Sequence, residues 1–191
     1  REKVLRDEQE SDVLLRIAGD TAKFGGWSVD LSSNKVSWSD QVARIHEMPI
    51  GYSPMVSEGI RFYAPEWREK INAVFTACAE KGIPYDEEME IITGRGRRVW
   101  VRMIGEAVRD DENRIVKVHG SFQDISDKKE SELAIQESER RLATLMANLP
   151  GMAYQCRLDR DWTMEFVSQG CKALTGYKPE ELIGNQCISY E

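Results

Sequence analysis

The sequence predicts an α+β domain in which helices cover one face of an antiparallel sheet. Residues 65–81 carry apolar side chains at helical spacing, whereas residues 85–125 switch to the alternation of apolar and polar side chains that is typical of strands. The pattern of residues 25–54 also starts again near residue 151, which indicates a duplicated domain rather than a short-period repeat.

The N-terminal part is expected to contain one helix and two strands. Residues 1–22 favour a helix, because they are rich in Glu, Arg, Asp and Leu and contain no proline. Gly25-Gly26 interrupts this pattern. Two short strands, Trp27–Leu31 and Lys35–Ser39, are predicted next, with Ser32-Ser33-Asn34 as the turn between them.

A short helix and a long helix are predicted after these strands. Asp40 is expected to cap a helix over Gln41–Glu47, and a loop containing proline and glycine follows. Pro65 suits the first turn of the long helix Pro65–Lys81, and Gly82 suits its end. One face of the long helix is expected to be buried, because apolar residues recur there at helical spacing: Ile71, Val74, Phe75 and Cys78.

Three long strands are predicted over Tyr85–Ile92, Val99–Val108 and Ile115–Ile125, joined as an antiparallel meander. The pairing can be inferred from the alternation of side chains, because a slip of one residue would exchange the two faces of a strand. The predicted pairs are Ile91 with Val99, Met89 with Val101, Glu88 with Arg102, and Ala107 with Val116 around the loop Asp110–Asn113.

Residues 127–148 return to a helical pattern. Ile135, Leu142 and Leu149 repeat every seven residues, as in a coiled coil, with Leu145 at a further seam position. Serines occupy other positions of the same seam. An ordinary amphipathic connector and a dimerising coiled coil therefore both remain open.

The last part of the chain resembles the first at the level of local pattern. Strands are predicted over Met152–Leu158 and Met164–Ser168, and Gly176-Tyr177-Lys178-Pro179 echoes Gly51-Tyr52-Ser53-Pro54. The sequence ends before a second long helix and three further strands could form. We therefore expect this second copy to be truncated and to leave apolar groups exposed unless a partner covers them.

Composition excludes several classes of function. The net charge of the 191 residues is −7, which disfavours nucleic-acid binding. No apolar run approaches the ~20 residues that span a bilayer, and the N-terminus has no signal-peptide core. The four cysteines lack metal-site spacing, so we expect free thiols in a reducing, cytoplasmic compartment.

Short motifs in this order resemble the bacterial PAS domain. Each is weak alone, but their order and spacing match the family over most of the chain. In the first copy the motifs are Gly25-Gly26-Trp27-Ser28-Val29-Asp30, Trp38-Ser39-Asp40, Ile45-His46-Glu47-Met48-Pro49, Arg97-Arg98-Val99-Trp100-Val101-Arg102 and Gly120-Ser121-Phe122-Gln123-Asp124-Ile125-Ser126. In the second copy they are Leu149-Pro150-Gly151-Met152, Met164-Glu165-Phe166-Val167-Ser168 and Leu174-Thr175-Gly176-Tyr177.

This resemblance implies a five-stranded PAS sheet flanked by helices, and it divides the chain into four parts: an N-terminal helix (1–22), a first PAS domain (23–126), a linker helix (127–148) and the start of a second PAS domain (149–191). Such domains usually precede a histidine kinase, a diguanylate cyclase or a cyclic-di-GMP phosphodiesterase. We expect a non-enzymatic input and relay module, a homodimer formed through helices, and an output domain in the same chain. The alternative is a dimerisation scaffold that binds no ligand.

A ligand site between the inner face of the sheet and the long helix remains open, whereas a filled core is the usual explanation of the same residues. No cofactor is predicted. A non-covalent small molecule or flavin remains open. The resemblance implies no haem, because PAS domains that bind haem usually do so through a histidine on the long helix, and this helix has none. His46 and His119 are expected to be at the surface or in hydrogen bonds. The candidate ligand-binding residues are Val74, Phe75, Met89, Ile91, Val101, Met103, Val118 and Phe122.

Two further sets of polar residues bear on function. On the strand Tyr85–Ile92, alternation places Asp86, Glu88 and Glu90 outward, where carboxylates remain solvated, and leaves Glu87 on the inner face at the rim or near a ligand. No nucleophile–base pair, phosphate loop or zinc motif was found. By family resemblance, a signal relay is expected at the junction with the linker helix: Asp124, Ile125 and Ser126.

Overall fold

The computed structural model describes residue 17, residues 19–148 and residues 150–186. The chain forms two compact units, which we call unit 1 (residues 1–129) and unit 2 (residues 130–191) and describe separately. Most of the helix expected over residues 1–22 lies outside the described residues. Residues 19–21 are helical.

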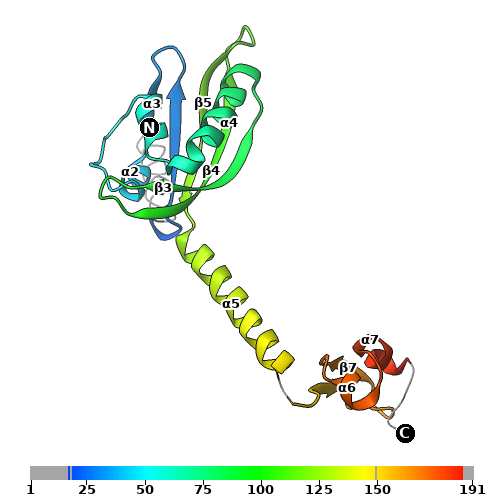
Figure 1. Cartoon of the computed structure of the whole chain (residues 1–191). Helices are drawn as coiled ribbons and strands as arrows, with labels where there is room; N and C mark the ends of the chain where they lie inside the picture. The colour runs from blue at the N-terminus through cyan, green and yellow to red at the C-terminus, as the bar shows by residue number, and fades with distance from the viewer. Residues whose placement is uncertain (1–16, 18, 149, 187–191) are drawn as a thin grey trace, which may run out of the picture. The chain divides into compact units, whose positions relative to one another are not determined.

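Unit 1 contains one antiparallel five-stranded sheet with the strand order β2-β1-β5-β4-β3. Helix α4 contacts β4 and β5, and it runs across the sheet in Figure 1. The α+β prediction is therefore confirmed. The strands are β1 (Phe24–Asp30), β2 (Lys35–Trp38), β3 (Tyr85–Ile92), β4 (Arg98–Arg109) and β5 (Ile115–Asp124), and the helices are α2 (Asp40–Ile45), α3 (Val56–Arg61), the 3₁₀ turn η1 (Pro65–Trp67) and α4 (Arg68–Lys81).

The turn between β1 and β2 has the predicted position. The Asp30 carboxylate accepts hydrogen bonds from the backbone N–H groups and hydroxyls of Ser32 and Ser33, which lowers the pKa of Asp30 to about 2. Asn34 adopts the left-handed conformation with φ 54°, which asparagine tolerates better than most residues. Local side-chain chemistry therefore defines this hairpin.

Two details of the helical segment differ from the prediction. Ser39, not Asp40, caps α2: its Oγ accepts a hydrogen bond from the Val42 N–H at 3.4 Å. The helix ends at Ile45, earlier than predicted, and Glu47 beyond it has φ 56°, which no α-helix contains. Helix α3 lies where a loop was expected, and the Glu58 carboxylate accepts a hydrogen bond from the backbone at its start.

The long helix has the predicted ends. Pro65 opens the 3₁₀ turn η1, α4 continues from it, and Gly82 closes α4 in the left-handed conformation with φ 73°. Within the predicted stripe, Ile71 and Cys78 are buried, whereas Val74 and Phe75 are half-buried and pack against the core. The stripe therefore faces the sheet, as the spacing indicated.

The first hairpin of the meander has the predicted register. Ile91 pairs with Val99, Met89 with Val101, and Glu88 lies opposite Arg102. The charge pairing differs, because the Arg102 guanidinium binds the Asp86 carboxylate on the diagonal, with Nε to Oδ1 at 2.7 Å. Alternation thus predicted the backbone register, but it did not predict which of the two neighbouring carboxylates, Asp86 or Glu88, binds Arg102.

The predicted register of the second hairpin is wrong by two residues. Ala107 pairs with Val118 and not with Val116. Two features each contribute one residue to the difference. The turn is tighter, because Asn113 takes the left-handed conformation with φ 64° and the Asp110 N–H bonds across the turn to Arg114 O at 2.9 Å, and the register shifts once more between Val108 and Arg109. A shift of two residues keeps every side chain on its predicted face.

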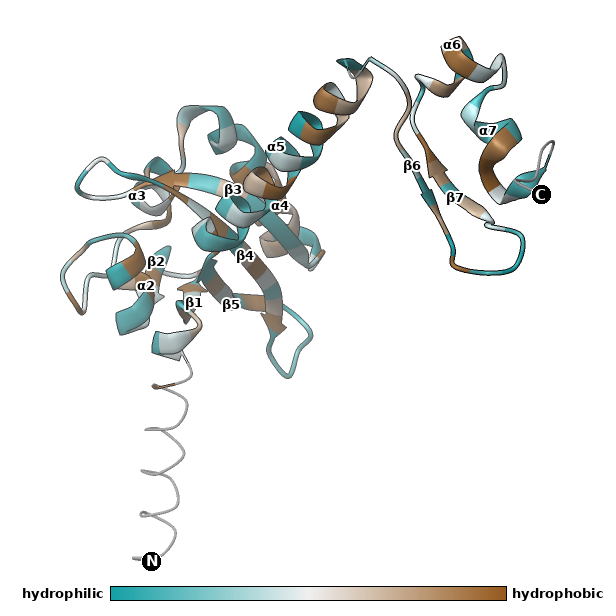
Figure 2. Cartoon of the chain, turned by 90° about the horizontal axis from the view of Figure 1, so that it is seen from below, coloured by the Kyte–Doolittle hydropathy of each residue, from teal (hydrophilic) through white to brown (hydrophobic). Residues whose placement is uncertain are grey.

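One hydrophobic core joins the inner face of this sheet to the covering helices. Hydrophobic segments along β3, β4 and β5, brown in Figure 2, alternate with polar ones. The side chains of Met89, Ile91, Val101 and Val118 have no exposed surface, and they form the centre of this core with residues of β1, β2, α2 and α4. Burial of this kind is the main stabilising term of a domain of this size.

Helix α5 (Ser126–Asn148) follows β5 after one residue and spans the predicted linker helix. Unit 2 contains a two-stranded antiparallel sheet and a small buried cluster. Its elements are β6 (Tyr154–Cys156), β7 (Met164–Val167), α6 (Cys171–Thr175), α7 (Pro179–Leu182) and the 3₁₀ turn η2 (Ile183–Asn185). None of the helices in the described part of the chain is long and apolar enough to cross a membrane.

Candidate functional site

A cavity of about 60 Å³ lies inside unit 1, between the sheet and the covering helices α2, α3 and α4. Three of the predicted ligand-binding residues, Phe75, Met103 and Phe122, line it. The structure does not place all eight together. The other five pack in the surrounding core and are not in the cavity wall: Val74, Met89, Ile91, Val101 and Val118. Ligand binding at these residues stays a prediction.

The polar groups of the cavity wall come from residues that the sequence prediction did not select. His46 and Tyr63 both line the cavity, together with Trp27 and Trp38. His46 follows the buried residues Val42 and Ile45 at helical spacing, and that spacing was a signal that its ring faces inward. Tyr63 lies in the segment that was predicted to be a loop, where alternation gave no signal.

The His46 side chain is only 2% exposed, so its predicted surface position is wrong. Its Nδ1 lies 2.8 Å from Val42 O, one helical turn earlier, so the alternative of a hydrogen-bonding role is confirmed. The ring stacks on Trp38, with ring centroids 4.1 Å apart. Burial lowers the pKa of His46 to about 4, which keeps the imidazole neutral at neutral pH.

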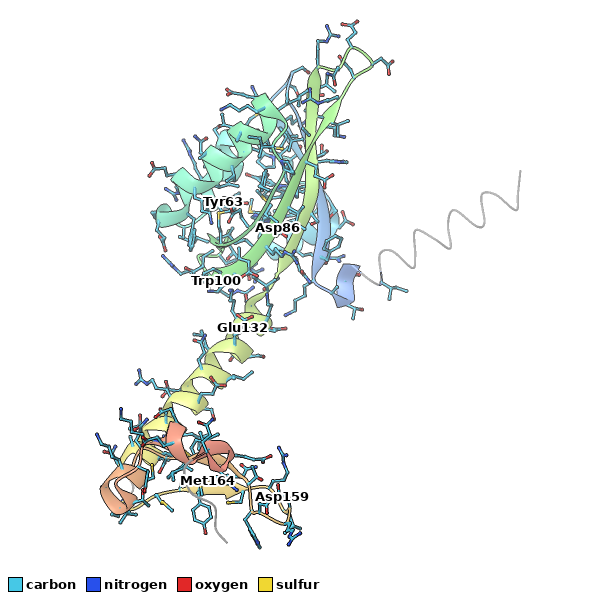
Figure 3. The ribbon with its side chains drawn as sticks, turned by 90° about the vertical axis from the view of Figure 1, so that its right-hand side faces the viewer. Tyr63, Asp86, Trp100, Glu132, Asp159 and Met164 are labelled. Carbon is cyan, nitrogen blue, oxygen red and sulfur yellow. The ribbon has the colours of Figure 1, made fainter. Side chains whose placement is uncertain are left out.

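Tyr63 supplies the second polar group of the wall. Its hydroxyl donates to Met103 Sδ at 2.8 Å, and thioether sulfur is a weak acceptor. Burial raises the pKa of the Tyr63 hydroxyl, so this group remains a protonated donor. Figure 3 labels Tyr63 in the region between α4 and the sheet.

The acidic residues of β3 form ion pairs. On the outer face Asp86 pairs with Arg102, and Glu90 pairs with Arg98 at 2.9 Å. Glu87 lies at the rim, half-buried, and pairs with Lys70 of α4. Among the residues that the structure describes, no group of three or more His, Cys, Asp or Glu side chains could hold a metal ion.

The junction between β5 and α5 is tied to β4 by hydrogen bonds. Asp124 Oδ1 accepts from the Ser126 N–H at 2.9 Å, which caps the start of α5. The Trp100 N–H donates to Ser126 Oγ at 3.2 Å, and the Ile125 N–H donates to Trp100 O at 2.9 Å. The side chain of Ile125 is buried. The first residues of α5 therefore continue the hydrogen-bonded sheet.

Charged residues tie the first turn of α5 to the outer face of the same sheet. The Glu88 carboxylate accepts from Lys128 Nζ at 3.0 Å and from Lys129 Nζ at 2.5 Å, and these ammonium groups lower the pKa of Glu88. Lys129 Nζ also lies 5.2 Å from the centre of the Trp100 ring. Trp100 is labelled near the start of α5 in Figure 3. We call these four residues the helix clamp.

Comparison with known proteins identifies both units. Residues 35–122 match the family model described as PAS fold, and residues 153–188 match the model described as PAS domain. The sensor protein FixL of Bradyrhizobium diazoefficiens is 23% identical over 164 residues, which cover 84% of this chain and 31% of the relative. The chain thus spans about a third of that relative's length.

Solved structures show the same fold. A sensory box histidine kinase/response regulator from Burkholderia thailandensis aligns with a TM-score of 0.53 and 22% identity, over 67% of this chain and 96% of that one. The N-terminal domain of a diguanylate cyclase with PAS/PAC sensor from Marinobacter aquaeolei aligns with a TM-score of 0.52 and 20% identity. The alignment covers 56% of this chain and 98% of that one. With its sheet, its covering helices and both family matches in agreement, the chain belongs to the PAS family of sensory, non-catalytic domains.

Proposed function

We propose that unit 1 is an input domain that passes the state of its core to α5 and on to an output domain of the same protein. The related proteins suggest a histidine kinase, or an enzyme of cyclic-di-GMP metabolism, as the output. Unit 2 would be a second PAS domain in tandem. The buried free thiols of Cys78 and Cys171 suit a reducing, cytoplasmic location.

The observation that carries this proposal is the junction of β5 with α5. Asp124 bonds to Ser126, and both Ile125 and Ser126 bond to Trp100 of β4. Strand β4 also contributes Met103 to the cavity wall. A change in the core that moves β4 or β5 would therefore reach the start of α5 through these hydrogen bonds. Signal transfer of this kind needs an element with two arrangements, and α5 is that element in our proposal.

Replacement of Glu88 by Gln tests the coupling. It removes the charge that holds Lys128 and Lys129, and two partly exposed ion pairs contribute roughly 1 kcal/mol in total. We expect amide hydrogen exchange in the first turns of α5 to become about fivefold faster, since 1 kcal/mol corresponds to about that factor. In the full-length protein the basal output should change as well.

The matched control is Glu90→Gln. Glu90 lies on the same face of β3, but its partner is Arg98 and not a residue of α5. This variant should leave both exchange in α5 and output unchanged. An output that stays normal in Glu88→Gln, although α5 exchanges faster, would show that the clamp does not carry the signal.

The alternative function is dimerisation without a ligand. Helix α5 exposes large apolar side chains, among them Leu142 at 54% and Leu145 at 60%, which a second copy could cover in a coiled coil. Under this alternative, sedimentation equilibrium of the chain should show a dimer that Leu142→Lys dissociates, and no ligand should change output. A dimer that persists in Leu142→Lys would rule out this seam.

A further inference from the structure

Among the residues that the structure describes, only one ring nitrogen of the His46 imidazole, Nδ1, has a hydrogen-bond partner. A carbonyl oxygen only accepts hydrogen bonds, so the contact between Nδ1 and Val42 O requires the proton to be on Nδ1. Because burial keeps the ring neutral, Nε2 carries a free lone pair. The contact with Val42 is the ring's hydrogen bond within the described residues, although the side chain is 2% exposed.

Aromatic neighbours fix the orientation of this nitrogen. Trp38 stacks on the ring, while Phe62 and Phe122 lie with their centroids 5.0 Å and 4.8 Å from it. The two nitrogens of an imidazole point in widely different directions. With Nδ1 directed at α2 and the ring in the cavity wall, Nε2 faces away from α2 as an oriented acceptor.

The rest of the wall limits what could bind there. None of the described Asp, Glu, Lys or Arg residues lines the cavity, so a charged ligand would be desolvated without a partner, which costs several kcal/mol. The volume of about 60 Å³ is far below the several hundred Å³ of most cofactor sites. It suits a molecule with few non-hydrogen atoms.

We propose that this cavity binds a small, uncharged molecule with an apolar body and one O–H or N–H group, which donates to His46 Nε2. This inference rests on the proposed input function and names the chemical class of the signal. The Tyr63 hydroxyl, now bonded only to a weakly accepting sulfur, is a second group that could turn to such a ligand. Half-buried Phe75 is the part of the wall that would move to admit it.

Pyrrole and furan form a matched pair of probes, because they are flat rings of similar size and only pyrrole has an N–H donor. We expect pyrrole to bind about tenfold more tightly than furan, since only pyrrole can donate a hydrogen bond to Nε2. Dissociation constants are measured on the 191-residue chain by NMR titration. The ¹⁵N resonance of His46 Nε2 should shift with pyrrole and not with furan.

His46→Phe keeps an aromatic ring in the cluster and removes the acceptor. In this variant the two probes should bind equally, while His119→Gln, on the exposed outer face, should retain the preference. If His46→Phe does not fold, the ¹⁵N shift in the unaltered chain decides alone. Equal binding of pyrrole and furan to the unaltered chain would overturn the inference, as would the absence of pyrrole binding. Neither result would change the outcome of the Glu88→Gln experiment, which needs no ligand and tests the proposed function separately.

Discussion

The two units share a local pattern but differ in how much they bury. In each, a short hairpin precedes a short helix, and a glutamate carboxylate accepts a hydrogen bond from the backbone N–H three residues earlier at the start of the next helix. The pairs are Glu58 with Met55 at 3.1 Å and Glu181 with Lys178 at 2.7 Å. These contacts need only nearby residues, so the same kind of sequence gives the same local structure twice.

Beyond this local level the units diverge. Unit 1 adds α4 and three long strands, and its core joins every strand of the sheet. The buried cluster of unit 2 consists of Met164, Val167, Cys171 and Leu182, while Leu158 is 89% exposed. A two-stranded hairpin is marginally stable by itself, and more strands or a helix are needed to bury a full face. The comparison therefore indicates that stability in this fold comes from the long strands and α4.

The same substitution in both units would test this comparison most strongly. Met89 in β3 has no exposed surface, and Met164 in β7 is 4% exposed. Met89→Ala should lower the free energy of unfolding of unit 1 by about 3 kcal/mol, because a rigid core cannot close the cavity. Met164→Ala should cost unit 2 only about 1 kcal/mol, because a small cluster can relax. Amide hydrogen exchange in β4 and in β7 measures the free energy of unfolding of unit 1 and unit 2 separately. Equal decreases in the two units would contradict the comparison.

Alternation of side chains explains why so much of the sheet was predictable. It assigned the buried faces of β3, β4 and β5, and in the first hairpin it also gave the pairing of Met89 with Val101. It could not distinguish registers that differ by two residues, because both put the same side chains inside. The turn at Asn113 and the register shift between Val108 and Arg109 together decided that question in the second hairpin.

The cavity was harder to predict than the sheet. The predicted site residues were chosen for their inward direction, but direction does not separate a residue that fills the core, such as Ile91, from one that borders an empty space, such as Phe122. His46 was expected at the surface or in a hydrogen bond, because histidine is usually not fully buried. Its burial depends on Trp38, Phe62 and Phe122, which approach from distant parts of the chain.

His46 also allows a smaller, pH-dependent difference between the units. The pKa of its ring is about 4 in the folded chain, against roughly 6.5 in the unfolded chain. Between these values the unfolded chain binds a proton that the folded chain does not, so stability falls as the pH falls. The free energy of unfolding of unit 1 should decrease by about 2 kcal/mol from pH 7 to pH 5.

Unit 2 contains no histidine and should not show this decrease. Chemical denaturation of unit 1 at both pH values measures the effect, with His46→Phe expected to abolish it and His119→Gln to leave it intact. The measurements are made only at pH 5 and above. Carboxylates with lowered pKa values, such as Glu88, lose their stabilising effect only in more acidic solution, so they do not contribute to the difference. An unchanged pH dependence in His46→Phe would mean that the ring is charged or solvated in the folded protein. A charged ring would have no free acceptor on Nε2, so the same measurement bears on the ligand class inferred for the cavity.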